Sequence, residues 1–272
     1  MRRTRRSLTE ARQRLPGDTK TAESRTPRCS WEARSPAAGL IEAFARNSPQ
    51  GLGKPPGPGG LDVLRRNPGA IPVVFRHGPE AVGTLARYGD EGVALVGQYG
   101  DDMLDFLRRT PDEAGDLARR ATEALDAARR LKEVGLHSDE AAGLIDTILD
   151  ASVHGSGDRV VIGTFRPPTG GPGYIDEALE NGGVYFNTPP GLYRDALAGN
   201  RQIMEEVNRE FLRGQMRAGV DRIELVGESI RQVLTKRADS FTAVELRLLM
   251  DEASRFGYRL QEGVWVRGAS TP

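Results

Sequence analysis

Few side chains of this chain can do acid–base chemistry near neutral pH, so each can be weighed individually. His77, His137 and His154 are its three histidines, and none of them lies after Arg159. A histidine acid–base pair within the C-terminal part of the chain is therefore excluded. His154, just ahead of an expected strand, is the one that could fold back as a general base. The alternative is a histidine between elements with no catalytic role.

The other polar candidates lie at a strand end or beside apolar helix positions. Glu228 and Ser229 follow the strand expected at 222–226, and ligands of open α/β sheets bind beyond the carboxyl ends of strands. Capping of the following helix is the alternative role for Ser229. Asn208 and Glu245 each stand beside apolar residues of an expected helix, so each either satisfies core groups or faces a site.

Metal-binding and phosphate-binding patterns are weak. Glu177 and Glu180 share one face of the helix expected at 174–181, but a solvated helix surface explains them equally well. The Gly-rich loop at 166–174 matches neither the dinucleotide-binding nor the P-loop pattern. We therefore expect no metal site, and the cofactor stays unknown.

Composition limits the classes of protein that the chain can belong to. Cys29 is its single cysteine, so no disulfide forms within the chain. No apolar run approaches the about 18 residues that span a membrane, and the basic start lacks the apolar stretch of a signal peptide. We expect a soluble protein without a signal peptide. Residues 1–60 carry 12 Lys and Arg against 5 Asp and Glu, whereas the remainder is slightly acidic.

Three segments are expected along the chain. Residues 1–60, rich in Arg, Pro and Gly, are expected to form a disordered basic arm and linker. In residues 61–153, short motifs containing Gly78, Gly89 and Gly100 recur 11 residues apart. This period fits either a continuous, slightly right-twisting helix or a string of short helices, which a glycine at each joint favours. Helices at 111–134 and 138–152 follow, the second capped by Ser138.

Residues 154–272 alternate between expected strands and helices, which indicates an α/β domain, with α+β as the alternative. We expect a small, largely parallel sheet covered by helices, with an antiparallel hairpin at its C-terminal edge. The expected strands lie at 159–165, 184–186, 222–226, 258–260 and 264–266, and the expected helices at 174–181, 190–198, 201–218, 230–234 and 241–256.

A set of short motifs runs in order through residues 159–267. They are Val160-Val161-Ile162-Gly163, Tyr174-Ile175-Asp176-Glu177-Ala178, Gly183-Val184-Tyr185-Phe186, Asn208-x-x-Phe211-Leu212, Gly219, Ser240-Phe241-x-x-x-Glu245-Leu246 and Gly257-Tyr258. Together they resemble the C-terminal toxin domain of bacterial polymorphic toxins of the contact-dependent-inhibition and Rhs types. The chain departs from that pattern where Met204 and Glu205 replace the tryptophan that precedes Asn208 in the family.

The resemblance implies an interbacterial effector, commonly a nuclease, that a small immunity protein neutralises. It further implies delivery into the target-cell cytoplasm as part of a larger secreted protein. The polar positions that it carries over are Tyr174, Tyr185, Asn208, Ser240 and Glu245.

We therefore expect a toxin-type hydrolase acting on RNA. One alternative is an NAD-consuming or ADP-ribosyl-transferring toxin, for which Arg159 is a candidate, although no E-x-E or Q-x-E motif stands near a suitable strand. A non-enzymatic binding, scaffold or immunity module is the other alternative. The enzymatic interpretation fails if Tyr174, Asn208, Glu228 and Glu245 are scattered over unrelated surfaces with no shared cleft.

Overall fold

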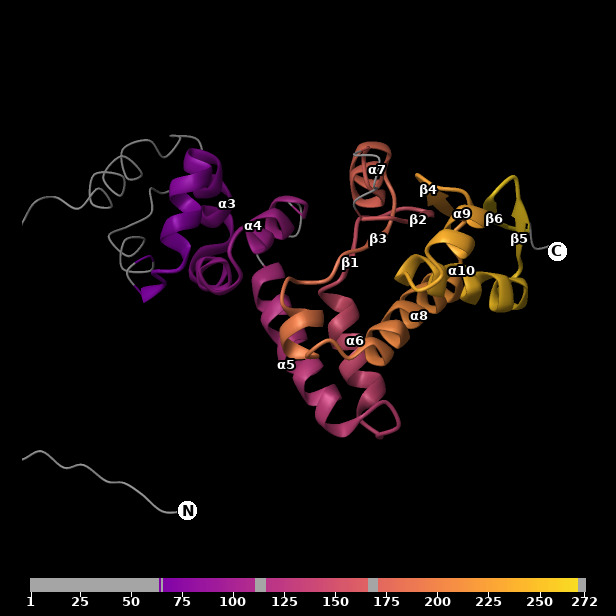
Figure 1. Cartoon of the computed structure of the whole chain (residues 1–272), viewed down its shortest axis with the longest axis horizontal. Helices are drawn as coiled ribbons and strands as arrows, with labels where there is room; N and C mark the ends of the chain where they lie inside the picture. The colour runs from indigo at the N-terminus through magenta and orange to yellow at the C-terminus, as the bar shows by residue number, and fades with distance from the viewer. Residues whose placement is uncertain (1–63, 65, 111–115, 166–170, 269–272) are drawn as a thin grey trace, which may run out of the picture.

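The computed structural model describes residues 64, 66–110, 116–165 and 171–268 (Figure 1). The basic arm expected at 1–60 and most of the Gly-rich loop at 166–174 lie outside these residues. In chain order the elements are α3 (Ala70–Tyr99), α4 (Asp101–Arg108), α5 (Leu117–Val134), α6 (Ala141–Asp150), β1 (Val153–His154), β2 (Arg159–Gly163), α7 (Tyr174–Asn181), β3 (Tyr185–Phe186), η2 (Leu192–Ala196), α8 (Arg201–Ala218), β4 (Arg222–Val226), α9 (Ile230–Lys236), α10 (Phe241–Glu252), η3 (Ala253–Phe256), β5 (Tyr258–Gln261) and β6 (Val264–Arg267).

The 11-residue repeat forms a string of short helices. Gly78, Gly89 and Gly100 have φ of 56°, 60° and 68° with ψ of −139°, −153° and −142°. Glycine adopts this region readily, whereas side chains with a Cβ rarely do. Each glycine therefore ends one helix and redirects the next, so that α3 is kinked and α4 begins a new direction (Figure 1). The preferred interpretation of the repeat is confirmed.

α5 and α6 pack together as a helical hairpin (Figure 1). The start expected for the second of these helices is wrong. The residue that precedes its first turn is Glu140, without a side-chain cap. The Ser138 hydroxyl instead donates to the carbonyl oxygen of Gly135 at 3.0 Å, so Ser138 stabilises the turn between the helices.

The main sheet has four strands in the order β2-β4-β6-β5. β2 and β4 are parallel, whereas β6 pairs antiparallel with both β4 and β5. On the other side of β2, Val184 forms a parallel bridge to Val160. The α/β class and the antiparallel C-terminal hairpin are as expected, but the sheet is mixed rather than largely parallel. A separate two-stranded sheet joins β1 to β3.

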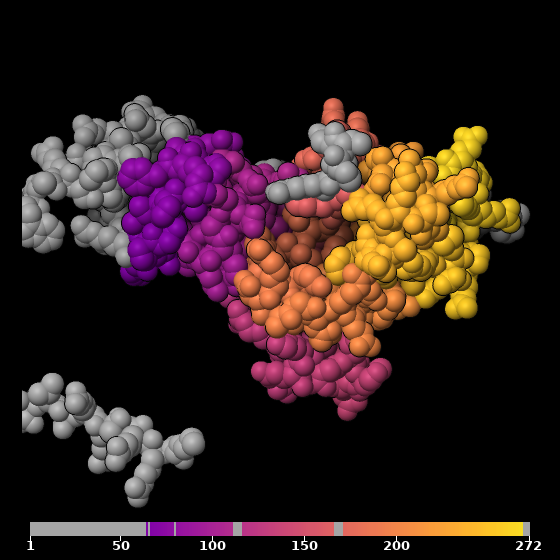
Figure 2. Space-filling model, in the orientation of Figure 1, coloured from indigo at the N-terminus to yellow at the C-terminus, as the bar shows by residue number. Residues whose placement is uncertain are grey.

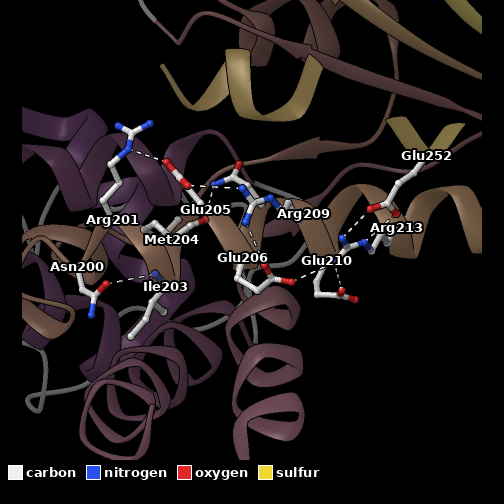
Figure 3. Close-up of polar contacts among 11 residues, drawn as sticks. Asn200, Arg201, Ile203, Met204, Glu205, Glu206, Arg209, Glu210, Arg213 and Glu252 are labelled. Atoms are coloured by element: carbon white, nitrogen blue, oxygen red, sulfur yellow. Dashed lines mark hydrogen bonds and ion pairs between the residues drawn. The ribbon is translucent and has the colours of Figure 1, made fainter. Parts of the chain in front are cut away.

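α8 is held by its cap and by its charged face (Figure 3). The Asn200 side chain accepts from the amide of Ile203 at 3.3 Å. Arg213 donates to both carboxylate oxygens of Glu252, at 3.0 and 2.7 Å, and so ties α8 to the end of α10. The opposite face of α8 buries its apolar stripe in the core, at Ile203, Met204, Val207, Phe211, Leu212 and Met216.

The helical segment and the C-terminal elements share one apolar core, which extends from Leu64 to Trp265. β1 crosses the boundary expected at residue 154, because Val153 pairs with Phe186 and His154 with Tyr185. η2 packs on α5, and α8 packs on α6. The division into domains at 154 stays a prediction. Within the described part of the chain, no helix is long and apolar enough to cross a membrane.

Candidate functional site

A cleft of about 680 Å³ lies beyond the carboxyl ends of β2 and β3. The residues at 163–165, which end and follow β2, and those at 186–191, which end and follow β3, contribute to its lining. β4 lies on the other side of β2 from Val184, so the chain leaves β2 at the point where a wound sheet changes direction. Such points open a crevice for ligands. The surface is hollowed here, between the helical segment and the C-terminal residues (Figure 2).

The walls of the cleft come from both sides of the expected domain boundary. The α4 region supplies Asp102, Asp105, Phe106 and Arg109. The C-terminal elements supply Gly163, Thr164, Phe165, Tyr174, Phe186, Asn187, Thr188, Pro189, Pro190, Gly191, Tyr193, Arg194, Met204, Asn208, Arg237, Asp239, Ser240, Phe241, Thr242 and Glu245. The cleft is therefore complete only when both segments are present.

Glu245 is the most perturbed acid in the cleft. α10 carries it on the face that packs toward α8 and β2, and the residue is only 7% exposed. Its carboxyl group has no hydrogen bond or ion pair with any residue that the structure describes. Burial raises the pKa of Glu245 to about 8. A carboxyl with this pKa exchanges its proton near neutral pH.

Tyr174 and Tyr185, the two predicted tyrosines, have different positions. Tyr174 lines the cleft, and its hydroxyl donates to the carbonyl oxygen of Phe186. Burial, reinforced by the charge of Glu245, raises the pKa of Tyr174 well above its usual value. Tyr185 is not among the lining residues. Its hydroxyl donates at 2.8 Å to the carbonyl oxygen of Arg109, which fixes the end of α4.

Asn208 and Ser240, two of the candidates from the sequence, both line the cleft. Asn208 is 3% exposed, and its Nδ2 donates to the carbonyl oxygen of Met204 at 2.9 Å. Its Oδ1 accepts no hydrogen bond from the residues described here. Ser240 begins α10, where its hydroxyl accepts from the amide of Ala243 at 3.1 Å. Ser240 is thus a helix cap at the cleft surface.

Glu228 lies behind the lining rather than in it. Its Oε2 accepts from the hydroxyl of Thr164 at 2.7 Å and from Nη1 of Arg237 at 2.9 Å. The Thr164 hydroxyl, followed by Arg237, lowers the pKa of Glu228. This carboxylate therefore positions two lining residues. Ser229 caps α9 and forms a capping box with Gln232, which is the alternative role given for it from the sequence.

His154 is buried beneath the cleft and does not line it. It is 1% exposed, and its Nε2 lies 3.0 Å from the carbonyl oxygen of Asn187. Its ring packs against Phe106 and Tyr185, with centroid distances of 5.6 and 5.5 Å. These contacts indicate a role in joining β1 to α4 and β3.

Arg159, the candidate for binding NAD, is also remote from the lining. It donates to Glu224 at 2.8 Å, to Glu177 at 3.0 Å and to the carbonyl oxygen of Gly182 at 3.1 Å. Its guanidinium thus holds α7 and β4 against β2. No three or more of the described His, Cys, Asp and Glu side chains are grouped so that they could hold a metal ion.

Three arginines at the cleft were not singled out from the sequence: Arg109, Arg194 and Arg237. Each faces a carboxylate, with distances of 3.0 Å from Arg109 to Asp176, 3.4 Å from Arg194 to Asp102 and 2.9 Å from Arg237 to Glu228. Asp176 and Asp102 lie far from their arginines in the sequence, so no local spacing predicts these two pairs. The aromatic residues near the strand ends were the sequence feature that could have indicated a cleft here.

Aromatic side chains form much of the cleft wall: Phe106, Phe165, Tyr174, Phe186, Tyr193 and Phe241. The rings of Tyr193 and Phe241 meet edge to face, with centroids 5.8 Å apart. The guanidinium of Arg109 lies 5.6 Å from the centroid of Phe165. Flat, apolar walls next to cations and carboxyls suit a ligand that combines planar rings with polar groups.

Comparisons of the chain with protein-family models, with curated proteins and with solved structures find no match.

Proposed function

We propose that the cleft is the active site of an interbacterial toxin effector domain that cleaves RNA. The observation that carries this proposal is Glu245, a buried carboxyl group at the cleft without a protein partner among the described residues and with a pKa of about 8. Desolvation tunes carboxyl groups in this way in enzymes that use them as general acids or bases.

The proposed reaction is cleavage of the RNA backbone by its own 2′-hydroxyl. The 2′-hydroxyl loses its proton as its oxygen bonds to phosphorus, the bond from phosphorus to the 5′-oxygen breaks, and the leaving 5′-oxygen takes up a proton. The products are a 2′,3′-cyclic phosphate and a free 5′-hydroxyl. An ionised Glu245 takes the first proton while water supplies the second, or a neutral Glu245 supplies the second while water takes the first. Either transfer typically accelerates a reaction by about 10²–10⁴-fold.

The other lining groups suit binding of the chain of nucleotides. Arg109 and Arg237 present N–H groups to a phosphate, and the aromatic walls stack on bases. Both arginines are already paired with carboxylates, Asp176 and Glu228. A phosphate therefore competes with these pairs, and we expect binding to weaken steeply as salt is added.

Hydrolysis of NAD is the second candidate, and the carboxyl groups of the lining favour it. Asp102, Asp105 and Asp239 line the cleft together with Glu245. Carboxylates suit the cationic nicotinamide ring. An ionised Glu245 would stabilise the oxocarbenium-like state that forms as the bond between the ribose and nicotinamide breaks. Nicotinamide leaves as a neutral molecule when this bond breaks, and water then adds to the ribose carbon and releases one proton.

The test is incubation of the purified full chain with total RNA, plasmid DNA and NAD, with Mg²⁺ and with EDTA. RNA fragmentation that Glu245→Gln reduces at least 100-fold is the expected result. Glu180→Gln is the matched control, because Glu180 is exposed on α7 and is not among the lining residues. Intact RNA under every condition would refute the nuclease, and NAD loss in its place would establish the second candidate.

The toxin role is tested separately in a bacterial host. Cytoplasmic expression of the chain should arrest growth, and Glu245→Gln should restore it at equal protein level. A small immunity protein encoded beside the toxin should restore growth as well, and should form a complex with the chain. Normal growth with the unaltered chain would support a non-enzymatic binding or scaffold module.

A further inference from the structure

The buried polar side chains divide into two groups. The buried polar and charged residues of the described chain are Thr110, Ser152, His154, Arg159, Thr164, Asn208, Thr242 and Glu245. Six of them use their side chains within the protein; for example, the Thr242 hydroxyl donates to the carbonyl oxygen of Gly163 at 2.9 Å. Asn208 and Glu245 are the two whose amide or carboxyl oxygens make no hydrogen bond with the described residues. Both line the cleft.

One side-chain atom of Asn208 is available to accept a hydrogen bond from a ligand. Its Nδ2 is occupied by the carbonyl oxygen of Met204, one turn earlier on α8. This bond leaves Oδ1, which can only accept. The residue is 97% buried, since its exposed fraction is 3%. Oδ1 is not among the fully buried polar atoms of the described residues that lack a partner. It is therefore accessible from the cleft that Asn208 lines, and a ligand donor that enters the cleft can bond to it.

The neighbouring surfaces indicate which donor this is. Phe186, Tyr174 and Phe241 line the same cleft, and flat aromatic surfaces bind planar rings by stacking. A nucleobase is planar and carries N–H groups on its edge, next to acceptor atoms. Asparagine commonly reads such edges in nucleic-acid complexes. Glu245, the other unpartnered group, supplies a carboxyl on the same cleft surface.

We infer that Asn208 is the residue that selects the substrate, by accepting an N–H of one nucleobase stacked in the cleft. The inference rests on the proposed function, since it names the residue that determines at which nucleotide the RNA is cleaved. Asn208 binds the substrate, whereas Glu245 transfers the proton. Loss of Asn208 therefore weakens the preference for one nucleotide, whereas loss of Glu245 abolishes cleavage of every sequence.

The first experiment measures kcat/KM of the full chain on four single-stranded RNAs that differ in one nucleotide. We expect one base to be preferred by at least tenfold, and Asn208→Leu to reduce that preference to about twofold. Ser152→Ala is the control, because Ser152 is buried and bonded to the carbonyl oxygen of Ile148 and does not line the cleft. An unchanged preference in folded Asn208→Leu would overturn the inference and leave the nuclease standing.

The second experiment needs no change to Asn208. Nucleosides are titrated into the Glu245→Gln chain, each beside an analogue whose base-edge N–H is methylated, such as 3-methyluridine beside uridine. For the preferred base, methylation should weaken binding at least tenfold. Equal affinities for all four pairs would overturn the inference. If the unaltered chain cleaves no RNA but the Glu245→Gln chain still binds nucleosides selectively, the nuclease is refuted and the role of Asn208 in binding a base is retained.

Discussion

Arg109 at the end of α4 and Asp176 in the first turn of α7 form an ion pair, with 3.0 Å between Nη1 and Oδ1. The second oxygen of Asp176 accepts from the amide of Gly173 at 2.9 Å. The Tyr185 hydroxyl holds the carbonyl oxygen of Arg109 from β3. These contacts fix one wall of the cleft, which belongs to the helical segment, onto α7, which carries Tyr174, and onto β3.

Asp176→Asn should lower the free energy of unfolding by less than about 1 kcal/mol. The amide keeps an acceptor for Gly173, and both partners of the ion pair are part exposed, at 28% and 44%, where solvent weakens such pairs. Urea denaturation at low and at high salt measures the loss, which should shrink at high salt. Asp126→Asn, at the more exposed pair with Arg129, is the control and should change stability very little.

Removal of residues 1–153 should leave residues 154–272 without cooperative folding. η2 and α8 pack on α5 and α6, so the fragment exposes apolar side chains of one shared core. We expect strong binding of a hydrophobic dye and a broad thermal transition, whereas a fragment of residues 61–268 should melt like the full chain. A sharp transition of 154–272 alone, with ordered near-UV circular dichroism, would establish the domain boundary at 154.

The stability of the protein should fall as the pH rises from about 5 to 8. Burial raises the pKa of Glu245 from 4.5 to about 8, so the folded state keeps a proton that the unfolded chain releases within this interval. The contribution is fully present below about pH 4.5 and is lost as the pH passes 8, with a slope of up to about 1.4 kcal/mol per pH unit.

Glu245→Gln should remove this slope and make the protein more stable than the unaltered chain at pH 8. Urea denaturation at several pH values between 5 and 8 provides the measurement. The pKa values of other acids, such as Glu177 and Glu228, are lowered. These acids change the stability only below this pH interval, so they do not contribute to the slope within it. Parallel pH profiles for the two proteins would mean that Glu245 is ionised in the folded state.

Gly89→Ala should lower the free energy of unfolding by about 1–3 kcal/mol. No atom lies within 4 Å of the added methyl group, so the loss of stability comes from the backbone. Its φ of 60° and ψ of −153° are strained for a residue with a Cβ. Gly83→Ala, within a helical stretch of α3 and also in open space, should instead stabilise the protein by about 0.5–1 kcal/mol. Thermal or urea denaturation distinguishes the two, and equal effects would contradict the kinked structure of α3.

Arg159→Met should destabilise the fold by about 2 kcal/mol. The substitution removes the hydrogen bonds to Glu177 and Glu224. Because both carboxylates are part exposed, the loss of stability is smaller than for a fully buried ion pair. Arg222→Met, an exposed position on β4, serves as the control. Full stability combined with loss of an NAD-dependent activity would instead give Arg159 the ligand-binding role that its partners argue against.

Local structure was predictable from the sequence wherever neighbouring residues determine it. The limits of α7, α8 and β4 follow from apolar periodicity and from caps within one turn, such as Ser240 on α10. The glycine joints of α3 follow similarly, because a backbone with positive φ needs no distant partner. The start of α6 was predicted wrongly because Ser138 could bond either forward as a cap or backward to Gly135, and both are local options.

The composition of the cleft was decided by tertiary structure. Asn208 and Glu245 were each identified as polar residues beside apolar ones, but sequence spacing cannot tell whether two helices point such residues at a common cavity. Tyr185, a candidate from the family resemblance, and His154, a candidate general base, are buried behind the cleft. The contribution of α4, and the pairing of Arg109 with Asp176, depend on packing between segments far apart in the chain. The sequence determined the elements through local energetics, whereas long-range packing and strand register determined which side chains meet.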